Sequence, residues 1–538
     1  MRYRPPSIIQ RLNALQAEHG WLRQDDLVLA ARDLGVPLHR IEGVASFYPH
    51  YRRTPPAAHR LDVCRDLACA MRGGAHCLAE LQAGAAAHEA ATGERVEVCE
   101  VSCLGRCDRA PAVLVEHDPH TGAAAALAAL HTEHAPEHLE VAARTYRVDP
   151  YARPGERYAT VRALAAGGAA AAEALLGELK EAGLRGMGGA GFPTALKWRT
   201  VRDAVSDEKF VVCNADESEP GTFKDRELLA SLPHLVWEGI LLGAVVVGAR
   251  RAIVYLRHEY ELERRVLARE QEVAARVADA LGIALEIFVS PGGYIMGEET
   301  ALLEALEDRR GEPRNKPPYP GIAGLFGQPT LINNVETLTM ATAIAARGAA
   351  WWKAQGLRGC AGLKFVSISG DVVSPGVYEL ATGTTIAELI ALAGGVPGGA
   401  SVQAVMPGGA STAFLGADAL GTPLDFDHLR RAGSSLGSGA VIVVAEGRDM
   451  LELGANVTRF FRNESCGKCV PCRVGTEKAV ALLDRWLAGE AAEGTPELLR
   501  QLDRTLAQTS ICGLGQVALL PVVSILDRLP PTRPTRRP

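Results

Sequence analysis

Three cysteines within seven residues constrain this chain more than any other feature. Cys466, Cys469 and Cys472 stand in "NESCGKCVPCRVG", and the two-residue gaps point three thiolates from one turn of backbone at a common centre. Zinc and iron–sulfur clusters both use that arrangement. A zinc site would usually close with a second CxxC pair or two histidines nearby, and neither follows. The next cysteine is Cys512, in "TSICGLGQ". The spacing therefore favours a [4Fe–4S] cluster and leaves zinc as the alternative.

A second cysteine group lies near the N-terminus. Cys64 and Cys69 are separated by four residues and Cys103 and Cys107 by three, and each pair follows a predicted strand. Four thiolates would then meet at one edge of a sheet, where they hold a [2Fe–2S] cluster or a zinc ion equally well. Gly105 would let the backbone approach a sulfur closely and donate hydrogen bonds, which tune a cluster's potential. Because disulfides are rare in the cytoplasm, the clustering of most of the chain's twelve cysteines in these two regions indicates metal ligation, whereas Cys213 and Cys360 stand alone.

Length and charge limit the remaining possibilities. A chain of 538 residues should hold three or four domains. Its net charge of −6 does not indicate binding to nucleic acid or to a membrane surface. The N-terminus lacks an apolar segment with a cleavage site, so we predict no signal peptide. The longest apolar run, "LVWEGILLGAVVVGA", contains Glu238, is too short to span a bilayer and is predicted to be buried core. We expect a cytoplasmic protein with no nucleic-acid partner and no membrane insertion.

A glycine-rich loop is predicted to approach a ligand closely. "LRGMGGAGFPTALKW" places Gly186, Gly188 and Gly191 in the pattern G-x-G-x-x-G. A Rossmann interpretation requires a strand before the loop, but the preceding segment reads as a helix, so that interpretation fails. Loops of this composition let the backbone approach a flavin or nucleotide phosphate, on which Lys197 would place a positive charge. A glycine-rich packing turn is the alternative.

Polar side chains gather in three further segments. They are "VVCNADESEPGTFKDREL" with Asn214, Asp216, Glu217 and Glu219, "GGYIMGEETALLEALE" with Glu298 and Glu299, and "PTLINNVETL" with Asn333 and Asn334. Acidic side chains suit ribose hydroxyls and the amide of a nicotinamide, and the two asparagines suit a flavin ring or ribityl chain. The paired glutamates open a predicted helix, where they also interact favourably with its dipole.

With these motifs laid out, residues from about 156 to 525 resemble the NADH-oxidising flavoprotein subunit of respiratory complex I and its soluble relatives. The resemblance rests on "LRGMGGAGFPTALKW", "NADESEPGTFKDREL", "YIMGEETALLEALE", "KPPYPGIAGLFGQPTLINNVETL", "ESCGKCVPCRVGT" and "SICGLGQ". The first 145 residues resemble the thioredoxin-like [2Fe–2S] subunit of the same module, through "VASFYPHY", the Cys64/Cys69 pair and "CLGRCDRAP". A chain that carries both is identified as a fused diaphorase, as in soluble NAD-dependent formate dehydrogenases and NAD-reducing hydrogenases.

The resemblance implies a multidomain α/β fold. Its expected parts are a helical segment plus thioredoxin-like [2Fe–2S] domain (1–145), a Rossmann-like FMN- and NADH-binding domain (156–350), a small β-grasp-like, ubiquitin-like domain (360–440), a helical [4Fe–4S] domain (445–525) and a disordered tail (526–538).

The resemblance also assigns site residues. The flavin site falls on Gly186, Gly188, Gly189, Lys197, Asn214, Asp216, Glu217, Ser218, Tyr294, Gly297, Glu298, Ile332, Asn333, Asn334 and Thr337, and the NADH site on Phe192, Glu219, Glu299, Lys316 and Tyr319. The [4Fe–4S] ligands are Cys466, Cys469, Cys472 and Cys512, and the [2Fe–2S] ligands are Cys64, Cys69, Cys103 and Cys107. Glu219 and Glu299 are expected to act in catalysis by placing the nicotinamide, without a protein general base.

Four positions depart from the family pattern. Met187 replaces the usual arginine of the glycine loop, and Met296 replaces the usual cysteine before Gly-Glu-Glu. Tyr319 stands where phenylalanine is common, and Thr200 stands where some relatives carry a further aromatic. We therefore expect the nucleotide site to lack the stacking contact that an aromatic residue at position 200 supplies in some relatives.

The predicted function is hydride exchange between NAD(H) and FMN and single-electron exchange with iron–sulfur clusters, coupled to a catalytic partner subunit. A molybdenum/tungsten formate dehydrogenase subunit with its own iron–sulfur clusters is favoured as the partner, because no extra C-terminal ferredoxin segment is present. The alternative is an NAD-reducing hydrogenase or another complex I-like module. A different class of function, a zinc-stabilised docking scaffold, predicts a colourless rather than yellow-brown protein.

Overall fold

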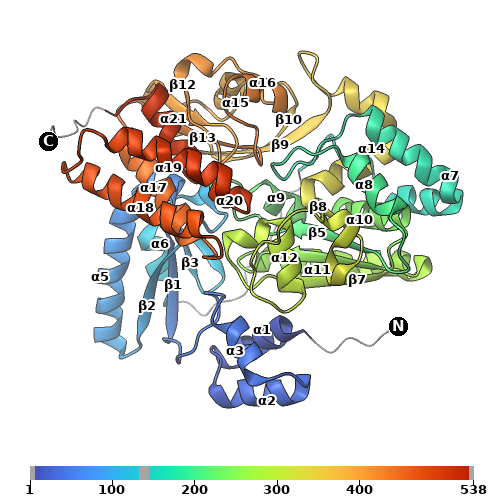
Figure 1. The fold of residues 1–538 in the computed structure, drawn as a ribbon, viewed down its shortest axis with the longest axis horizontal. Coiled ribbons are helices and arrows are strands. Elements are labelled where there is room, and N and C mark those ends of the chain that lie inside the picture. The colour runs from blue at the N-terminus through green and yellow to red at the C-terminus, as the bar shows by residue number, and fades with distance from the viewer. Residues whose placement is uncertain (1–6, 132–143, 532–538) are drawn as a thin grey trace.

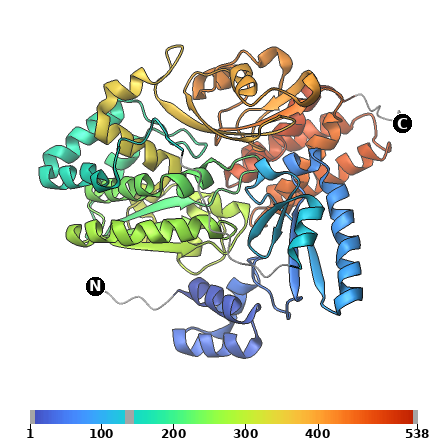
Figure 2. The ribbon, with the colours of Figure 1, turned by 180° about the vertical axis from the view of Figure 1, so that it is seen from behind.

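The computed structural model describes residues 7–131 and 144–531. Figures 1 and 2 show the thioredoxin-like domain beside the large α/β domain, with the helical C-terminal domain against the first and the β-grasp-like domain against the second. The predicted α/β multidomain architecture is confirmed.

The N-terminal segment forms three helices, as its helical spacing predicts. They are α1 (Ile8–His19), α2 (Gln24–Leu34) and α3 (Leu38–Ala45). The segment is anchored to the large α/β domain, because the Tyr48 hydroxyl donates to the carbonyl of Arg309 at 2.7 Å and the Ile9 amide donates to Asp308 at 3.0 Å. Met296, one of the four departures, is fully buried beneath this contact, in the same core cluster as Tyr48.

The thioredoxin-like domain is a four-stranded sheet of order β2-β1-β3-β4 with helices packed on it. Its elements are β1 (His59–Cys64), α4 (Leu67–Met71), α5 (Gly74–Thr92), β2 (Val96–Val101), β3 (Ala112–Val115), β4 (Asp118–Thr121) and α6 (Gly122–Ala129). Strands β1 and β2 run parallel, so the loops that follow them meet at one edge of the sheet. Cys64 ends β1, and the loop after β2 carries Cys103 and Cys107.

The large α/β domain contains a parallel sheet of order β7-β6-β5-β8. Its elements are α7 (Ala159–Glu181), α8 (Thr194–Asp203), β5 (Phe210–Ala215), α9 (Lys224–Ser231), α10 (Pro233–Val247), β6 (Arg251–Leu256), α11 (Glu261–Leu281), β7 (Ala284–Val289), α12 (Glu299–Leu306), α13 (Pro320–Ala323), β8 (Thr330–Asn334) and α14 (Val335–Ala354). From β5 the chain adds β6 and β7 on one side and then returns to add β8 on the other. The carboxyl ends of β5 and β8 therefore flank a topological switch point, where open α/β sheets bind their ligands.

The last two domains complete the fold. The β-grasp-like domain has the sheet order β10-β9-β13-β11-β12, built from β9 (Leu363–Gly370), β10 (Gly376–Ala381), α15 (Ile386–Leu392), β11 (Val402–Met406), β12 (Leu415–Gly416), α16 (Phe426–Arg431) and β13 (Ala440–Ala445). The helical domain comprises α17 (Met450–Asn463), α18 (Val470–Leu487), α19 (Thr495–Thr509), α20 (Gly513–Val517) and α21 (Leu520–Arg528). Helix α21 thus enters the segment predicted as a tail, of which residues 532–538 lie outside the described residues.

The segment after the thioredoxin-like domain, which the two prolines Pro150 and Pro154 suggest to be a linker, packs on the large α/β domain. Tyr146 and Val148 are buried in its core cluster, and the Tyr151 hydroxyl donates to Glu238 of α10 at 2.7 Å.

Three buried arginines hold the loop that carries Cys103 and Cys107, called the second cysteine loop below, against the large α/β domain. We call these contacts the arginine clamp. The contacts are Arg106 to Glu263 (2.8 and 2.9 Å), Arg226 to Asp108 (2.7 Å) and Arg257 to the carbonyl of Cys103. Gly105 has a φ of 67°, and a Cβ atom at this position would lie 2.4 Å from the Tyr260 hydroxyl. The loop therefore needs glycine here to approach the neighbouring domain, as well as to donate its amide to the sulfur of Cys103.

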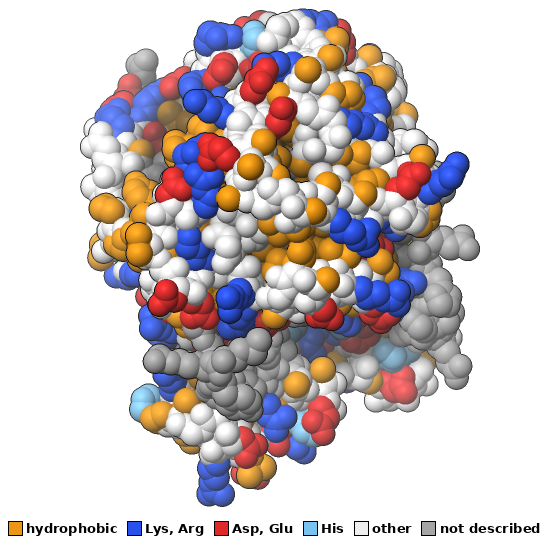
Figure 3. Space-filling model, turned by 90° about the vertical axis from the view of Figure 1, so that its right-hand side faces the viewer, with side chains coloured by type: hydrophobic (Ala, Val, Ile, Leu, Met, Phe, Trp, Pro, Cys, Tyr) orange, Lys and Arg blue, Asp and Glu red, His pale blue; other side chains and the backbone are white. Residues whose placement is uncertain are grey.

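Within the described residues, one helical stretch, Pro154–Glu181, has the length and mean hydropathy (1.2) that a membrane span requires, and the pair α9 and α10, bent by 96°, would be a second if taken as one span. Core helices of soluble proteins pass the same test, and α7 packs against α10 and α14. Figure 3 looks onto the side of the molecule where α7 lies and shows apolar and charged side chains interspersed over it. Helix α10, which contains the longest apolar run, is buried almost throughout, as predicted.

Candidate functional site

One cavity of about 1030 Å³ lies at the carboxyl ends of β5 and β8. Every residue that the sequence predicts to bind FMN or NADH lines it. A site for one drug-sized ligand measures about 300–1,000 Å³, so this cavity has the capacity for a flavin and part of a nucleotide side by side.

The glycine loop forms one wall, between α7 and α8. Gly189 has a φ of 119°, which L-residues rarely adopt, and a Cβ on Gly188 would lie 3.0 Å from the Cβ of Asn334. The loop is held in place because the Met187 amide donates to the Thr337 hydroxyl at 2.8 Å. The Met187 side chain is buried and does not line the cavity, so the position that usually holds arginine contributes packing instead of charge.

Two of the three lysines that line the cavity, Lys197 and Lys316, contact Glu299. Lys197 lies 3.4 Å from the Glu299 carboxylate and donates to the carbonyl of Ile332 at 3.1 Å. Lys316 lies 2.8 Å from Glu298 and 3.4 Å from Glu299. The second oxygen of Glu298 caps α12 by accepting from the amides of its first turn, the helix-terminal role that the sequence left open.

Burial changes the character of the acidic loop after β5. It raises the pKa of Asp216 to about 6 and that of Glu217 to about 7. The Asp216 carboxylate accepts from the Ser218 and Ser290 hydroxyls at 2.5 and 2.7 Å. The Glu217 carboxylate accepts from two amides at the start of α9 and from Tyr260. These side chains therefore fix the shape of the loop as well as lining the cavity.

The amides predicted to read a flavin also hold the walls together. Asn214 donates to the carbonyl of Gly297 at 2.9 Å, Asn333 accepts from the Trp198 indole at 2.8 Å, and Asn334 accepts from the first turn of α14. Each asparagine thereby joins the end of a strand to a neighbouring element.

Glu219 connects the cavity to two other domains. Its carboxylate accepts from the Tyr294 hydroxyl at 2.7 Å and from the Ser411 amide of the β-grasp-like domain at 2.6 Å. Burial raises the pKa of this carboxyl. The Tyr294 amide in turn donates to Glu464 at 2.8 Å, and Glu464 also accepts from Ser102 beside the second cysteine loop. Glu464 thus joins three domains, two residues before the first cysteine of the C-terminal group.

Sequence reasoning missed the residues that close the cavity from outside the large α/β domain. They are Ser411, Ser435, Gly437 and Ser438 of the β-grasp-like domain and Gly513, Leu514 and Val517 of α20. The small-residue run "AGSSLGSGA" (432–440) was the available signal for Ser435, Gly437 and Ser438, since such runs let backbone approach a ligand.

The thiols of Cys64, Cys69, Cys103 and Cys107 are all buried at the sheet edge where the sequence predicts them. The sulfurs of Cys103 and Cys107 lie 3.5 Å apart, and the Ala112 amide donates to the sulfur of Cys69 at 3.4 Å. Hydrogen bonds from the Cys107 and Cys64 thiols lower the pKa of Cys103. Four converging sulfurs with amide donors fit a [2Fe–2S] cluster.

The C-terminal thiols gather around the start of α20. Burial raises the pKa of Cys472 and of Cys512 to about 11, and Cys466 lies within electrostatic reach of both. Free thiols with such values stay protonated at neutral pH, so the site is completed when a bound metal draws off the protons. Cys512 precedes Gly513, which lines the cavity, so this ligand set directly adjoins the cavity.

Family models match all four domains. They are described as a thioredoxin-like [2Fe-2S] ferredoxin (residues 1–129), a Nuo51 FMN-binding domain (179–343), an SLBB domain (365–415) and an NADH-ubiquinone oxidoreductase-F iron-sulfur binding region (452–533). The chain accordingly contains an FMN-binding domain, a [2Fe–2S] domain and a [4Fe–4S] region. These matches support iron–sulfur clusters over the zinc alternative at both cysteine groups.

Known proteins resemble the chain over much of their length. An F-type subunit of the NADH-quinone oxidoreductase of Rhizobium meliloti is 44% identical over 353 residues, which is 64% of this chain and 83% of the relative. The corresponding F-type subunit of Escherichia coli is 41% identical over 65% of this chain and 82% of the relative. A chain of an NAD+-reducing [NiFe]-hydrogenase, solved in its H2-reduced state, superposes with a TM-score of 0.86 at 34% identity and covers 97% of this chain and 92% of its own.

Proposed function

This chain belongs to the family of NADH-quinone oxidoreductase F-type subunits, extended at its N-terminus by a thioredoxin-like [2Fe–2S] domain, and on that premise we propose how its cavity works. The proposed flavin site comprises Gly186, Gly188, Gly189, Lys197, Asn214, Asp216, Glu217, Ser218, Tyr294, Gly297, Glu298, Ile332, Asn333, Asn334 and Thr337, and the proposed NADH site comprises Phe192, Glu219, Glu299, Lys316 and Tyr319. The observation that carries the proposal is that a single cavity, at the switch point of the sheet, holds both sets and adjoins Cys512.

When bound, the flavin supplies hydride exchange with the nicotinamide and one-electron exchange with iron–sulfur clusters. The chain's own residues position the reactants. The exposed rings of Phe192 and Tyr319 (47% and 60% exposed) stand at the rim, where they offer faces on which an adenine stacks. Tyr294 and Glu219 form the inner wall, and their mutual hydrogen bond fixes both side chains. Residues of the β-grasp-like domain and of α20 close the cavity from outside the large α/β domain.

We expect the enzyme to use NAD(H) rather than NADP(H). Among the described residues, the lining holds six carboxylates and three lysines, and like-charge contacts with a 2′-phosphate cost several kcal/mol. Lys224 and Arg226 are the basic residues that follow the acidic loop in the sequence, but Lys224 is bound to Asp225 and Glu336, and Arg226 to Asp108. The kcat/KM for NADH should exceed that for NADPH by about 10²-fold or more. Comparable values for the two nucleotides would refute this expectation.

Glu299→Gln is expected to lower the kcat/KM for NADH oxidation with ferricyanide by about 10- to 10²-fold, because small misplacements of a reactant are costly. The substitution keeps the size of the side chain but removes the charge that holds Lys197 and Lys316. FMN content should stay near one per chain. Glu304→Gln is the matched control, since Glu304 lies on the same helix but pairs with Arg314 outside the cavity. Equal losses in the two variants would show that the effect is on α12 as a whole.

The family relationship supports assembly with a catalytic partner subunit. From the sequence we propose a cytoplasmic complex with a molybdenum/tungsten formate dehydrogenase subunit that carries iron–sulfur clusters. A solved structure that covers nearly the whole chain is from an NAD+-reducing [NiFe]-hydrogenase, and this similarity supports a hydrogenase partner as the second candidate.

Purification of the chain from its native source under mild conditions, followed by assays of NAD+ reduction, separates the two candidates. Activity with formate and molybdenum or tungsten in the complex would support the first. Activity with H2 and nickel in the complex would replace it with the second. NADH–ferricyanide activity with neither donor would place the chain in another complex I-like module.

A further inference from the structure

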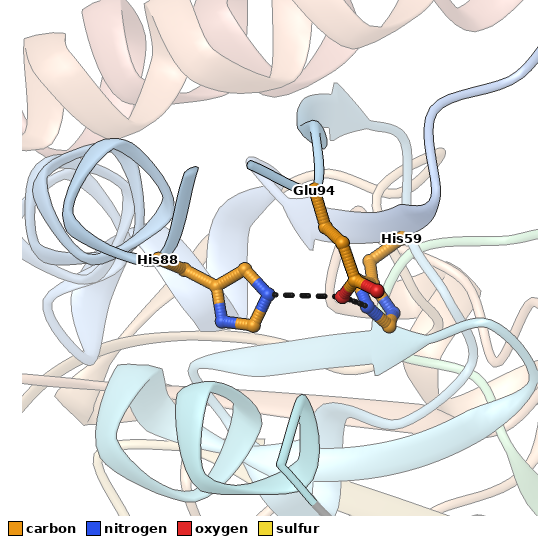
Figure 4. Close-up of side chains that lie close together, drawn as sticks. All are labelled: His59, His88 and Glu94. Atoms are coloured by element: carbon orange, nitrogen blue, oxygen red, sulfur yellow. Dashed lines mark hydrogen bonds and ion pairs between the residues drawn. The ribbon is translucent and has the colours of Figure 1, made fainter. Parts of the chain in front are cut away.

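Two histidines and a glutamate converge at the end of the thioredoxin-like sheet that lies far from its cysteines. The His59 Nε2 atom is 3.2 Å from a Glu94 carboxylate oxygen, and the His88 Nε2 atom is 3.6 Å from the same oxygen. Figure 4 shows the carboxylate between the two imidazole rings. One ligand atom from each residue can be chosen so that all three lie within 4.8 Å of one another.

His88 carries the strongest sign that this cluster has a ligand. Its side chain is 4% exposed, its Nδ1 atom has no partner among the described residues, and its Nε2 atom faces only the Glu94 carboxylate, at 3.6 Å, beyond hydrogen-bond distance. A buried polar group without a partner costs about 1–3 kcal/mol. Because the Nε2 atom points at the carboxylate, a group placed between His88, His59 and Glu94 would satisfy it.

The backbone holds the three residues in place. His59 begins β1, and its amide donates to the carbonyl of Arg95 at 3.2 Å, directly after Glu94. Helix α5, which carries His88, ends at Gly93 with a φ of 79°, and this turn folds the chain back so that Glu94 faces the helix. The Glu94 amide also donates to the Thr92 hydroxyl at 3.1 Å. The cluster is therefore built from rigid elements rather than from surface side chains that meet by chance.

We propose that His59, His88 and Glu94 bind a divalent transition-metal ion of the zinc type. Ligand atoms bound to tetrahedral zinc at about 2.0–2.2 Å lie roughly 3.3 Å apart. The distances from the Glu94 oxygen to the two histidine Nε2 atoms, 3.2 and 3.6 Å, are close to that value. Two imidazoles with one carboxylate suit zinc, nickel or copper, whereas magnesium and calcium require oxygen ligands. Three protein ligands leave a fourth position for water.

This site is separate from the iron–sulfur centres. Its histidine His59 starts β1 and Cys64 ends it, so the length of a six-residue strand, roughly 17 Å, lies between them. The ion would tie the end of α5 to the start of β1 and stabilise the thioredoxin-like domain.

Zinc binding by the cluster-loaded, full-length protein tests the proposal. The protein is depleted with a mild chelator, dialysed against zinc and freed of unbound metal, and its zinc and iron are then counted by mass spectrometry. The wild type and the control His76→Gln should each retain about one zinc per chain more than Glu94→Gln and His88→Gln retain. His76 is a suitable control because it lies on the same helix and pairs only with Glu80, at 3.3 Å, among the described residues.

X-ray absorption at the zinc edge gives the second readout. Nitrogen and oxygen ligands at about 2.0–2.2 Å are expected, whereas zinc that has replaced iron at the cysteines shows sulfur near 2.3 Å. Glu94 is exposed, so Glu94→Gln keeps the fold if the buried His88→Gln does not. Equal zinc in the wild type and Glu94→Gln, a sulfur shell, or no retained zinc in the wild type would each overturn the proposal.

Discussion

A Cys512→Ser protein is expected to oxidise NADH with ferricyanide at nearly the wild-type rate while its electron transfer to a partner falls by about 10²-fold or more, since even outer-shell changes at a metal site cost 10–100-fold. Serine cannot supply the thiolate that completes the set with Cys466, Cys469 and Cys472. The [4Fe–4S] signal in the reduced EPR spectrum should therefore disappear or convert. The backbone of α20 adjoins the cavity, but serine is nearly isosteric, so FMN should be retained.

Cys360→Ser is the matched control for that experiment. Its thiol is half-buried and donates to Asp425 at 2.8 Å, outside both cysteine groups. It should leave the spectrum and the coupling unchanged. An unchanged [4Fe–4S] signal in Cys512→Ser, together with full coupling to the partner, would mean that Cys512 is not the fourth ligand.

Gly189→Val is expected to yield a protein with both clusters but with FMN affinity lowered by about 10²-fold or more. A valine at a φ of 119° is strained by about 1–3 kcal/mol. Its Cβ would already be in van der Waals contact with the backbone of Gly437, at 3.6 Å, so the two methyl groups beyond it would have to enter the space between the loop and the β-grasp-like domain. The loop must then move away from the cavity that it lines. Flavin fluorescence after acid release measures the bound FMN.

Gly183→Val separates the loss of space from backbone strain. Gly183 also has a positive φ, of 67°, but a Cβ there meets nothing within 4 Å, and the residue does not line the cavity. This control should lose stability and keep its flavin. If both variants lose FMN equally, the effect comes from strain at the end of α7, and the glycine loop is not the flavin wall.

Local spacing explains why much of this site could be predicted from the sequence. The cysteine runs and the glycine loop each place chemistry within one turn of backbone, and Asn333 and Asn334 follow a strand of apolar residues that reads clearly as buried. The parallel sheet then brings the ends of β5 and β8 together, because neighbouring parallel strands share one edge.

Contacts between domains could not be predicted in the same way. The part of Ser411, Ser435 and Ser438 in closing the cavity depends on how the β-grasp-like domain docks, and no local pattern specifies that. A contact within one domain was missed as well: the sequence predicts Glu217 to be a ligand-binding carboxylate, while the structure also places its oxygens on the amides that begin α9. The segment around Tyr146 is predicted to be a linker from its prolines. Its packing could not be predicted, because the residues that it contacts lie far along the chain.

The arginine clamp on the second cysteine loop has a consequence for how the protein matures in the cell. Cys64, Cys69, Cys103 and Cys107 are each at most 4% exposed, and the last two lie in the core cluster of the neighbouring domain. We therefore expect iron and sulfide from a delivery protein to reach these sulfurs before the two domains dock. In contrast, Cys466, Cys469 and Cys512 remain partly accessible in the folded chain. Biogenesis should therefore follow a fixed order, with the [2Fe–2S] cluster inserted into a nascent, undocked domain and the [4Fe–4S] cluster added to the finished fold.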